Sequence, residues 1–400
     1  MPGSVRQLSL EEAREFIKGR SFHSPAPDLV GLETEWLVFF DGDAAAPAPF
    51  GRLCAAVQGA GRPPGGSAVT YEPGGQLELS GPPAHSVGVA CQAMATDVAF
   101  ARRVVAREGL ALVGHGLDPF RSPQRVVDSP RYRAMEEFFA ADGADGGRMM
   151  SCTAAVQVNV GMGRPGASRA RWARANVLGP ALLAAFANSP AQDGRPTGWK
   201  STRLATWWAI DPSRTAPVGP AGGATAWADY ALAARVMFIR EEERRYQALE
   251  RPLSFKRWLR DGHELGHPTL DDLEYHLTTL FPPVRPRGWL EVRYLDALPD
   301  PWWRVAATVV ATLLVDEGAG AAAELAVAGT EGLWQEAARA GLRHPGLAAA
   351  ALGCFTAALE AGVRTGADPA SLELTAEYCD RYVARGRCPA DDHLESLAWT

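Results

Sequence analysis

Gly31-Leu-Glu-Thr-Glu-Trp-Leu-Val-Phe-Phe40 has the composition of a β-strand, and the turn signal Asp41-Gly42 follows it. Side chains alternate across a strand, so Glu33 and Glu35 project from the same face. Two neighbouring carboxylates repel each other unless a cationic group lies between them. A hard divalent cation such as Mg²⁺, which takes oxygen ligands, suits this position. Taken alone, however, the stretch fits an exposed antiparallel strand with a solvated polar face better.

Three further segments repeat this polarity, with apolar side chains on one face and acids, amides or arginine on the other. The polar pairs are Glu33 and Glu35, Gln76 and Glu78, Gln157 and Asn159, and Glu291 and Arg293. If these strands share a sheet, one face packs on helices and the other presents several acids. Carboxylates that hold Mg²⁺ ions can orient a nucleotide triphosphate, and an arginine beside them can stabilise a transferring phosphoryl group.

Composition narrows the class of protein. The chain has 400 residues, 47% hydrophobic and 22% charged, which is typical of a globular protein with one large domain or two ordinary ones. The net charge is −6 with scattered basic residues, which argues against nucleic acid as a partner. No membrane-length apolar run or signal peptide is visible, and the six cysteines contain no C-x-x-C pair. We therefore expect a cytoplasmic protein without a membrane partner.

Helical patterns surround the strand segments, and no internal repeat or clean domain boundary is visible. We expect helices after Ser9, over 86–107, 132–140, 168–187 with a break at Gly179-Pro180, 226–245, after Thr269, and from Pro301 onward. Residues 41–68 and 188–215 are expected to be irregular, and 149–160 to form a strand. The chain is expected to be a single catalytic domain over 1–400, with the motifs in 28–304 and a helical region in 305–400.

A zinc hydrolase is the alternative from a different class. His263-Glu-Leu-Gly-His267 matches the H-E-x-x-H pattern, and Glu291 lies downstream as a third ligand. That chemistry needs both histidines one turn apart on a helix. Gly262, Gly266 and Pro268 oppose such a helix, which more plausibly begins at Thr269.

The motifs closely resemble those of the glutamate–cysteine ligases of the plant and bacterial type. The segment Glu72-Pro-Gly-Gly-Gln-Leu-Glu78 is distinctive, and the resembling segments run in order from about residue 30 to 295. They are Gly31–Glu35, Glu72–Pro83, Val156–Asn159, Ala187–Pro190, Gly194–Gly198 with Arg203, Asp211–Thr215, Asp229–Leu232, His276–Pro282 and Leu290–Arg293. The Arg- and Ala-rich composition looks like the actinobacterial branch associated with ergothioneine biosynthesis.

The resemblance implies a glutamine-synthetase-like α+β fold. Its curved, mainly antiparallel sheet forms a funnel, with helices on the outer face and a helical C-terminal region. It also implies that ATP phosphorylates the γ-carboxylate of L-glutamate and that the amine of L-cysteine attacks the acyl phosphate, giving γ-glutamylcysteine. The same ligation with another amine acceptor remains open, as does a non-catalytic amino-acid-binding relative.

The resemblance also implies roles for individual residues. Glu33, Glu35, Glu78 and Glu291 would be Mg²⁺ ligands, with Glu72 and Gln157 in the metal and substrate shell. Arg293, beside Glu291, would contact the ATP phosphates and the transferring group, and Arg203 and Arg214 would bind amino-acid carboxylates. Gln157 could instead satisfy buried backbone groups, and either of these last two arginines could be a plain ion pair. The partners are small-molecule substrates, and the chain is expected to be a monomer or homodimer.

One segment departs from the family's pattern. After the Glu-x-Arg strand the plant enzymes have a Gly-Gly-Pro-Trp type of turn, whereas this chain continues as Leu295-Asp-Ala-Leu-Pro-Asp-Pro-Trp302. The nucleotide contacts of that turn are therefore not transferred to this chain, and residues 305–400 match no motif.

Overall fold

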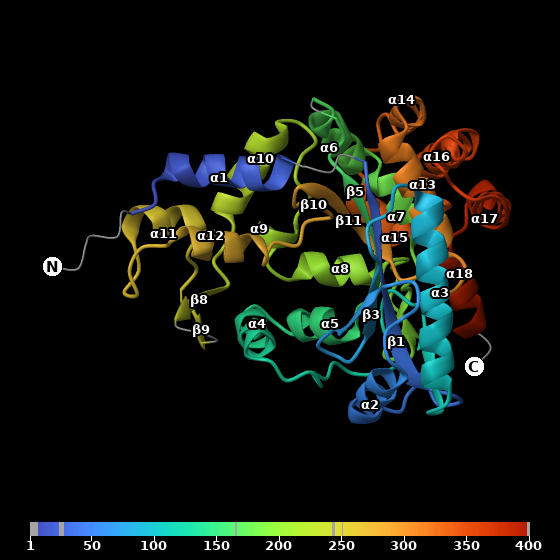
Figure 1. Cartoon of the computed structure of the whole chain (residues 1–400), viewed down its shortest axis with the longest axis horizontal. Coiled ribbons are helices and arrows are strands. Elements are labelled where there is room, and N and C mark those ends of the chain that lie inside the picture. Colours follow the sequence, from blue (N-terminus) through green and yellow to red (C-terminus); the bar gives the residue numbers. More distant parts are fainter. Residues whose placement is uncertain (1–6, 24–27, 165, 242–244, 250, 398–400) are drawn as a thin grey trace.

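A seven-stranded antiparallel sheet forms the centre of the molecule in the computed structural model. The model describes the chain except residues 1–6, 24–27, 165, 242–244, 250 and 398–400 (Figure 1). Six strands follow the order β10-β11-β5-β1-β3-β2, and β4 pairs with the second half of β1. The strands are β1 Val30–Phe40, β2 Ala68–Tyr71, β3 Leu77–Ser80, β4 Leu110–Val113, β5 Ala155–Gly161, β10 Val284–Pro286 and β11 Trp289–Asp296.

The strand β1 pairs with β3 on one side and with β5 on the other, so the opening stretch of the sequence lies at the centre of the sheet. Its two faces differ as the alternation predicts. Leu32, Thr34 and Trp36 are buried on one face, where the Thr34 hydroxyl lies 3.4 Å from the sulfur of Met94 in helix α3 (Val87–Ala106). The opposite face carries the glutamates.

Helices cover both faces of the sheet but do so unequally. Figure 1 shows α3, α13 (Trp303–Val315), α16 (Pro345–Ala361) and α17 (Pro369–Arg381) on one side. On the other side it shows α4 (Pro130–Ala140), α5 (Asp145–Cys152) and α8 (Thr202–Ala209). In α13 nearly every residue is buried, because this helix packs between β5 and the C-terminal helices. On the other side a smaller apolar cluster joins α4 and α5 to Ile210, Met237 and Phe238, and a cavity remains between it and the sheet.

The remaining elements connect these layers. The helices are α1 Leu10–Phe22, α2 Phe50–Ala60, α3 Val87–Ala106, α4 Pro130–Ala140, α5 Asp145–Cys152, α6 Ser168–Val177, α7 Gly179–Phe186, α8 Thr202–Ala209, α9 Pro212–Thr215, α10 Gly223–Ala233, α11 Phe255–Asp261, α12 Leu270–Leu277, α13 Trp303–Val315, α14 Glu317–Ala326, α15 Trp334–Ala340, α16 Pro345–Ala361, α17 Pro369–Arg381 and α18 Pro389–Leu397, with short 3-10 turns at Gly341–Arg343 and Val383–Arg385. Two small hairpins pair β6 Ala191–Gln192 with β7 Arg195–Pro196, and β8 Phe238–Glu241 with β9 Arg245–Ala248.

Several local predictions are confirmed. Ser9 and Thr269 each begin a helix with a reciprocal capping box, which satisfies backbone N–H groups that have no partner within the helix. The helix over 168–187 is interrupted where predicted, since α6 ends at Val177 and α7 begins at Gly179 with Pro180 in its first turn. The antiparallel sheet with helices on its outer face is also confirmed.

Other local predictions are wrong. The segment 41–68 contains α2, whose buried Leu53 and Val57 stand four residues apart as on one helix face. Met149–Cys152 belong to α5, so the strand begins only at Ala155. The segment 188–215 contains α8 and α9. The helix expected over 226–245 ends at Ala233, because the chain turns into the β8–β9 hairpin; residues 242–244 lie outside the described residues.

Within the described part of the chain, no single helix has both the length and the apolar character needed to cross a membrane. Trp303–Val315 and Glu317–Ala326 meet that test only as a pair, and they are bent by 104°. The division of the chain at residue 304 stays a prediction.

Candidate active site

The four polar strand segments meet at one cavity of about 310 Å³, on the face of the sheet that carries the glutamates and lies opposite α3. The prediction that they share a sheet is confirmed by the pairing of β1 with β3 and β5, and of β5 with β11. The predicted residues that line the cavity are Glu33, Glu35, Glu72, Glu78, Gln157, Arg203, Glu291 and Arg293.

Three carboxylates form a compact cluster in this cavity. Glu35 lies opposite Glu78 in the β1–β3 register, and Glu72 reaches the same point from the turn before β3. One oxygen from each lies within 4.8 Å of the other two, so a single cation can contact all three. Oxygen donors at this spacing fit Mg²⁺. The sequence analysis assigned Glu72 to the metal and substrate shell, and the structure places its carboxylate in the cluster with Glu35 and Glu78.

Burial and neighbouring negative charge disfavour the ionised forms of Glu35 and Glu72, and the pKa of each is raised. Burial, and then the charge of Glu78, raises the pKa of Glu35 to about 7. Burial, and then the charges of Glu35 and Glu78, raise the pKa of Glu72 well above its ordinary value. A bound cation reverses this balance because it favours the ionised carboxylates.

Glu33 lies next to this cluster on β1 and faces β5 and β11. The Asn159 side chain donates to its Oε1 at 3.0 Å, and burial, Glu291 and Glu78 raise the pKa of Glu33 to about 7. Gln157 donates to Glu35 at 3.0 Å and accepts from Arg293 at 2.7 Å. The side chain of Gln157 thus bonds to two side chains of the site. The alternative hypothesis, in which it satisfies buried backbone groups, fits these contacts less well.

Glu291 is surrounded by guanidinium groups. Its Oε2 accepts from Arg285 and from Arg293, the latter at 3.1 Å, and its Oε1 accepts from Arg287 at 3.3 Å. Burial opposes ionisation, but Arg285 and Arg293 outweigh it and hold the pKa of Glu291 well below its usual range. Both oxygens are engaged by arginine in this structure, so the metal-ligand role of Glu291 stays a prediction.

The two arginines predicted to bind amino-acid carboxylates lie in different surroundings. Arg203 lines the cavity and donates to the backbone oxygen of Arg293 at 2.9 Å. Its Nε and Nη1 are buried without a hydrogen-bond partner among the described residues, although Nη1 lies 3.8 Å from the Asp296 carboxylate. Because Arg203 also lines the cavity, its positive charge favours an anionic ligand there.

Arg214 is not among the described residues that line the cavity. It is fully buried and donates to the Asp211 carboxylate at 2.9 Å, the Thr279 oxygen at 2.7 Å and the Arg235 oxygen at 2.6 Å. Its donors therefore tie α9 to neighbouring segments, which matches the ion-pair alternative better than a substrate contact.

Sequence reasoning missed several residues of the cavity. Arg131 and Tyr132 begin α4, Trp207 lies in α8, and Arg285 and Arg287 flank Pro286 in β10. Arg285 belongs to β10 and Arg287 directly follows it, and both donate to Glu291. No local pattern indicates Arg131, which donates to the hydroxyl of Tyr275 and to Thr278 across more than 140 residues.

The zinc-protease pattern lies elsewhere. His263 forms an isolated bridge with Gly266, between the end of α11 and the start of α12, so the motif is not helical. The Nδ1 atom of His267 lies 2.6 Å from the Gln7 side chain. Neither histidine is among the described residues that line the cavity. The geometry that zinc hydrolysis requires is absent from this described segment.

Comparisons with known proteins agree with the geometry. The family model described as glutamate-cysteine ligase family 2 (GCS2) matches residues 29–399. The glutamate–cysteine ligase EgtA of Mycobacterium tuberculosis H37Rv is 40% identical, over 99% of this chain and 92% of the relative. EgtA of Mycolicibacterium smegmatis is also 40% identical, over 98% and 93%. The chloroplastic glutamate–cysteine ligase of Medicago truncatula is 28% identical, over 76% and 56%.

A solved structure supports the fold. The glutamate–cysteine ligase of Francisella tularensis, crystallised in complex with AMP, is 14% identical and has a TM-score of 0.56, over 93% of this chain and 85% of that one. At this identity the likeness concerns the fold alone. The family match over nearly the whole chain carries the conclusion: the chain belongs to glutamate–cysteine ligase family 2.

Proposed function

We propose that this chain joins L-glutamate to L-cysteine with ATP and Mg²⁺, forming γ-glutamylcysteine, ADP and phosphate. Family membership and the full-length similarity to two EgtA proteins support the ligation and its place in ergothioneine biosynthesis. The observation that carries the mechanism is the carboxylate cluster of Glu35, Glu72 and Glu78, which shares one cavity with Arg203 and Arg293.

The acids of the cavity would hold the metal. Glu35, Glu72 and Glu78 would bind one Mg²⁺ ion, and Glu33 with Glu291 would offer oxygens to a second. Mg²⁺ supplies charge neutralisation for the ATP phosphates and fixes their orientation. This ligand set extends the sequence prediction by adding Glu72, whose oxygen is close enough to the other two for a shared ion.

The arginines would bind the anions. Arg293 lies between Gln157 and Glu291, where its guanidinium would stabilise negative charge on the transferring phosphoryl group. Arg203, whose guanidinium group lies at the wall of the cavity, would bind an amino-acid carboxylate. The glutamate γ-carboxylate oxygen attacks the terminal phosphorus of ATP and ADP leaves. The cysteine nitrogen then forms the amide bond at the acyl carbon, and phosphate departs.

The activity is tested with purified protein, ATP, Mg²⁺ and glutamate, by following phosphate release as candidate amines are added. Cysteine should stimulate release, with γ-glutamylcysteine identified by mass spectrometry. If another amine stimulates release and cysteine does not, the acceptor assignment is wrong. Activity that is lost when zinc is stripped but persists without Mg²⁺ would favour the hydrolase.

The proposed setting is the cytoplasm. All six cysteines lie in the described part of the chain and all are free, which fits a reducing compartment. Oligomeric state stays a prediction of monomer or homodimer, and size-exclusion chromatography with light scattering would distinguish the two.

A further inference from the structure

The turn between β2 and β3 controls two of the three clustered carboxylates. Two backbone hydrogen bonds close this turn. The N–H of Gly75 donates to the backbone oxygen of Glu72 at 2.8 Å, and the N–H of Glu72 donates to the backbone oxygen of Gln76 at 3.0 Å. Gly75 has a φ of +87°, which favours glycine. Glu72 opens the turn and Glu78 follows it by two residues, so a shift of the turn moves both carboxylates relative to Glu35.

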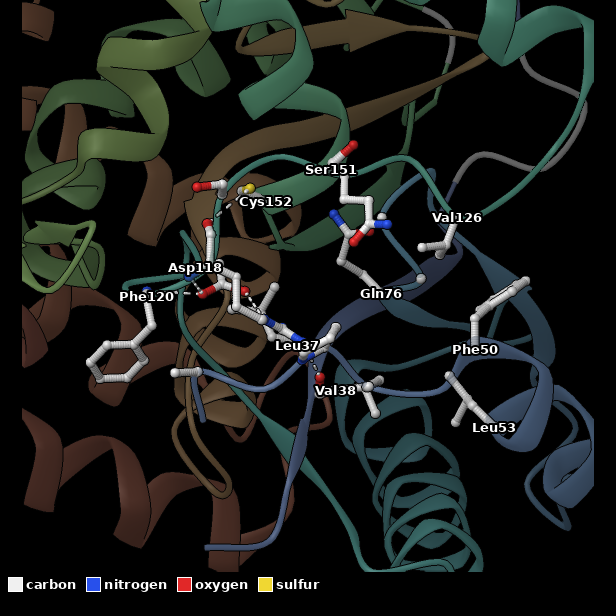
Figure 2. A pocket seen from close by; sticks show the side chains of 18 residues that line it. Leu37, Val38, Phe50, Leu53, Gln76, Asp118, Phe120, Val126, Ser151 and Cys152 are labelled. Carbon is white, nitrogen blue, oxygen red and sulfur yellow. Dashed lines mark hydrogen bonds and ion pairs between the residues drawn. The ribbon is translucent and has the colours of Figure 1, made fainter. Parts of the chain in front are cut away.

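This turn separates two cavities. Glu72 and Pro73 line the active-site cavity, whereas Gly74, Gly75 and Gln76 line a second cavity of about 320 Å³ (Figure 2). The end of α5 also lies between the two cavities. Met149, Met150 and Thr153 line the active-site cavity, and Ser151 and Cys152 line the second cavity. The turn and the end of α5 thus form the wall between the two cavities.

The Gln76 carboxamide fastens the turn to this end of α5. Its Nε2 donates to the Thr153 oxygen at 2.8 Å and lies 3.4 Å from the Met150 oxygen, and the residue is only 2% exposed. Gly74 lies so close to Ser151 that a Cβ atom would stand 2.0 Å from the Ser151 oxygen. The carboxamide therefore donates on the α5 side and away from the metal cluster, although the alternation along 76–80 had placed Gln76 beside Glu78.

Two backbone hydrogen bonds also hold the turn at Pro73. The backbone N–H groups of Val126 and Val127 donate to the Pro73 oxygen at 2.8 and 3.1 Å. These bonds come from a loop, whereas the Thr153 oxygen that accepts from Gln76 lies two residues before Ala155, the first residue of β5. The Ala155 N–H in turn donates to Glu35 at 2.8 Å. Gln76 thus links the turn to the same short segment that orients the third carboxylate.

We propose that Gln76 is a positioning residue that sets the separation of Glu72, Glu78 and Glu35 and thereby the Mg²⁺ affinity of the cluster. This inference rests on the proposed function, because it assumes that the cluster holds the metal. Gln76 does not touch the metal position itself. Residues that orient metal ligands in this way typically change metal affinity by about 10- to 100-fold when they are replaced.

The test replaces Gln76 by methionine, which keeps length and volume but removes the amide donor. Thermal unfolding is followed while MgCl₂ is added without ATP or amino acids, at constant ionic strength. We expect the Mg²⁺ concentration for the half-maximal rise in Tm to increase roughly tenfold or more. The Mg²⁺ concentration for half-maximal turnover should increase likewise, while kcat at saturating Mg²⁺ stays close to that of the unchanged protein.

Gln124→Met is the matched control. Gln124 lines the same second cavity but is exposed, and it should leave both Mg²⁺ curves unchanged. If Gln76→Met fails to fold, Gln76→Asn is measured instead, because its shorter amide keeps polarity but cannot reach the same oxygens. A lower kcat with an unaltered Mg²⁺ curve overturns the positioning role.

Failure of the inference and failure of the proposed function give different results. If Mg²⁺ stabilises the unchanged protein and Gln76→Met responds at the same concentrations, only the inference is wrong. If Mg²⁺ does not stabilise the unchanged protein at all, the metal cluster of the proposed function fails, and the role of Gln76 fails with it.

Discussion

Stabilisation by Mg²⁺ should depend strongly on pH, and the direction follows from the carboxylates of the cavity. Glu33 and Glu35 have pKa values raised from 4.5 to about 7, chiefly by burial, and that of Glu72 is raised well above 4.5. In the unfolded chain these groups lose their protons near pH 4.5. Without metal, the folded protein therefore binds more protons than the unfolded chain between about pH 4.5 and 7, and the free energy of unfolding falls as pH rises through this window.

The magnitude follows from the same values. A pKa raised from 4.5 to about 7 corresponds to on the order of 3 kcal/mol of unfolding free energy per carboxyl, lost by pH 7 and above. Mg²⁺ replaces the protons and removes this cost. The rise in Tm at saturating Mg²⁺ should therefore be small near pH 5.5 and large at pH 8. At intermediate pH, the metal affinity should fall about tenfold for each unit by which the pH is lowered and for each proton that the metal displaces.

The assay is thermal unfolding at pH 5.5, 6.5, 7.5 and 8.5, with and without MgCl₂, at ionic strength matched with NaCl. Calorimetry in two buffers of different ionisation enthalpy reports the protons released when the metal binds. Glu35→Gln, which removes one of the raised carboxyl groups, should reduce the proton release and flatten the pH dependence. A Tm increase that is equal at all four pH values, or greater at pH 5.5, would refute the reasoning.

Four further predictions concern single side chains. Glu35→Gln should lower turnover by about 100-fold or more, measured by phosphate release, because it removes an anionic metal ligand worth about 3 kcal/mol in the transition state. Arg203→Lys should raise KM for an amino-acid substrate roughly tenfold in steady-state kinetics, because lysine cannot make a bidentate contact. Arg214→Met should lower the free energy of unfolding in urea by about 3–5 kcal/mol, because it removes the guanidinium group that pairs with the buried Asp211 carboxylate. His267→Ala should leave turnover within about twofold, because it lies outside the cavity.

Each of these has an outcome that contradicts it. Near-normal turnover of Glu35→Gln would remove its metal role, and circular dichroism is the control for folding. An unchanged KM in Arg203→Lys for both amino acids would show that this guanidinium binds neither carboxylate. If Arg214→Met is stable but has a raised KM, the buried ion pair is not its main role. Loss of turnover in His267→Ala with the fold intact would revive the zinc hypothesis.

The interior of the site shows where sequence reasoning ends. The side chains of Glu33 and Glu35 were correctly placed on one face, because alternation along a strand is a local property of the backbone. Gln76 follows a turn rather than lying within a strand, so the same rule failed there. Its amide bonds to backbone oxygens more than 70 residues away.

The arginines show most clearly the difference between what local sequence predicts and what tertiary packing determines. Arg203 and Arg214 both belong to segments that resemble family motifs, yet one lines the cavity and the other fastens α9 within the fold. Arg131 and Arg285 were not singled out at all, although both line the site. Nothing within a few residues of an arginine determines which acceptor its long side chain will meet, because that depends on which segments pack against it.

Local sequence was enough to predict the strands with one polar face, the helix starts at Ser9 and Thr269 and, through the ordered motifs, the family. Those features depend on backbone periodicity, local hydrogen bonds and short motifs. Only the tertiary structure decided that Glu72 joins Glu35 and Glu78 within 4.8 Å, and that Glu291 is enclosed by arginines. Carboxylates and guanidinium groups from separate segments act on one another only after the sheet has brought them within a few ångströms, and no local pattern in the chain sets that distance.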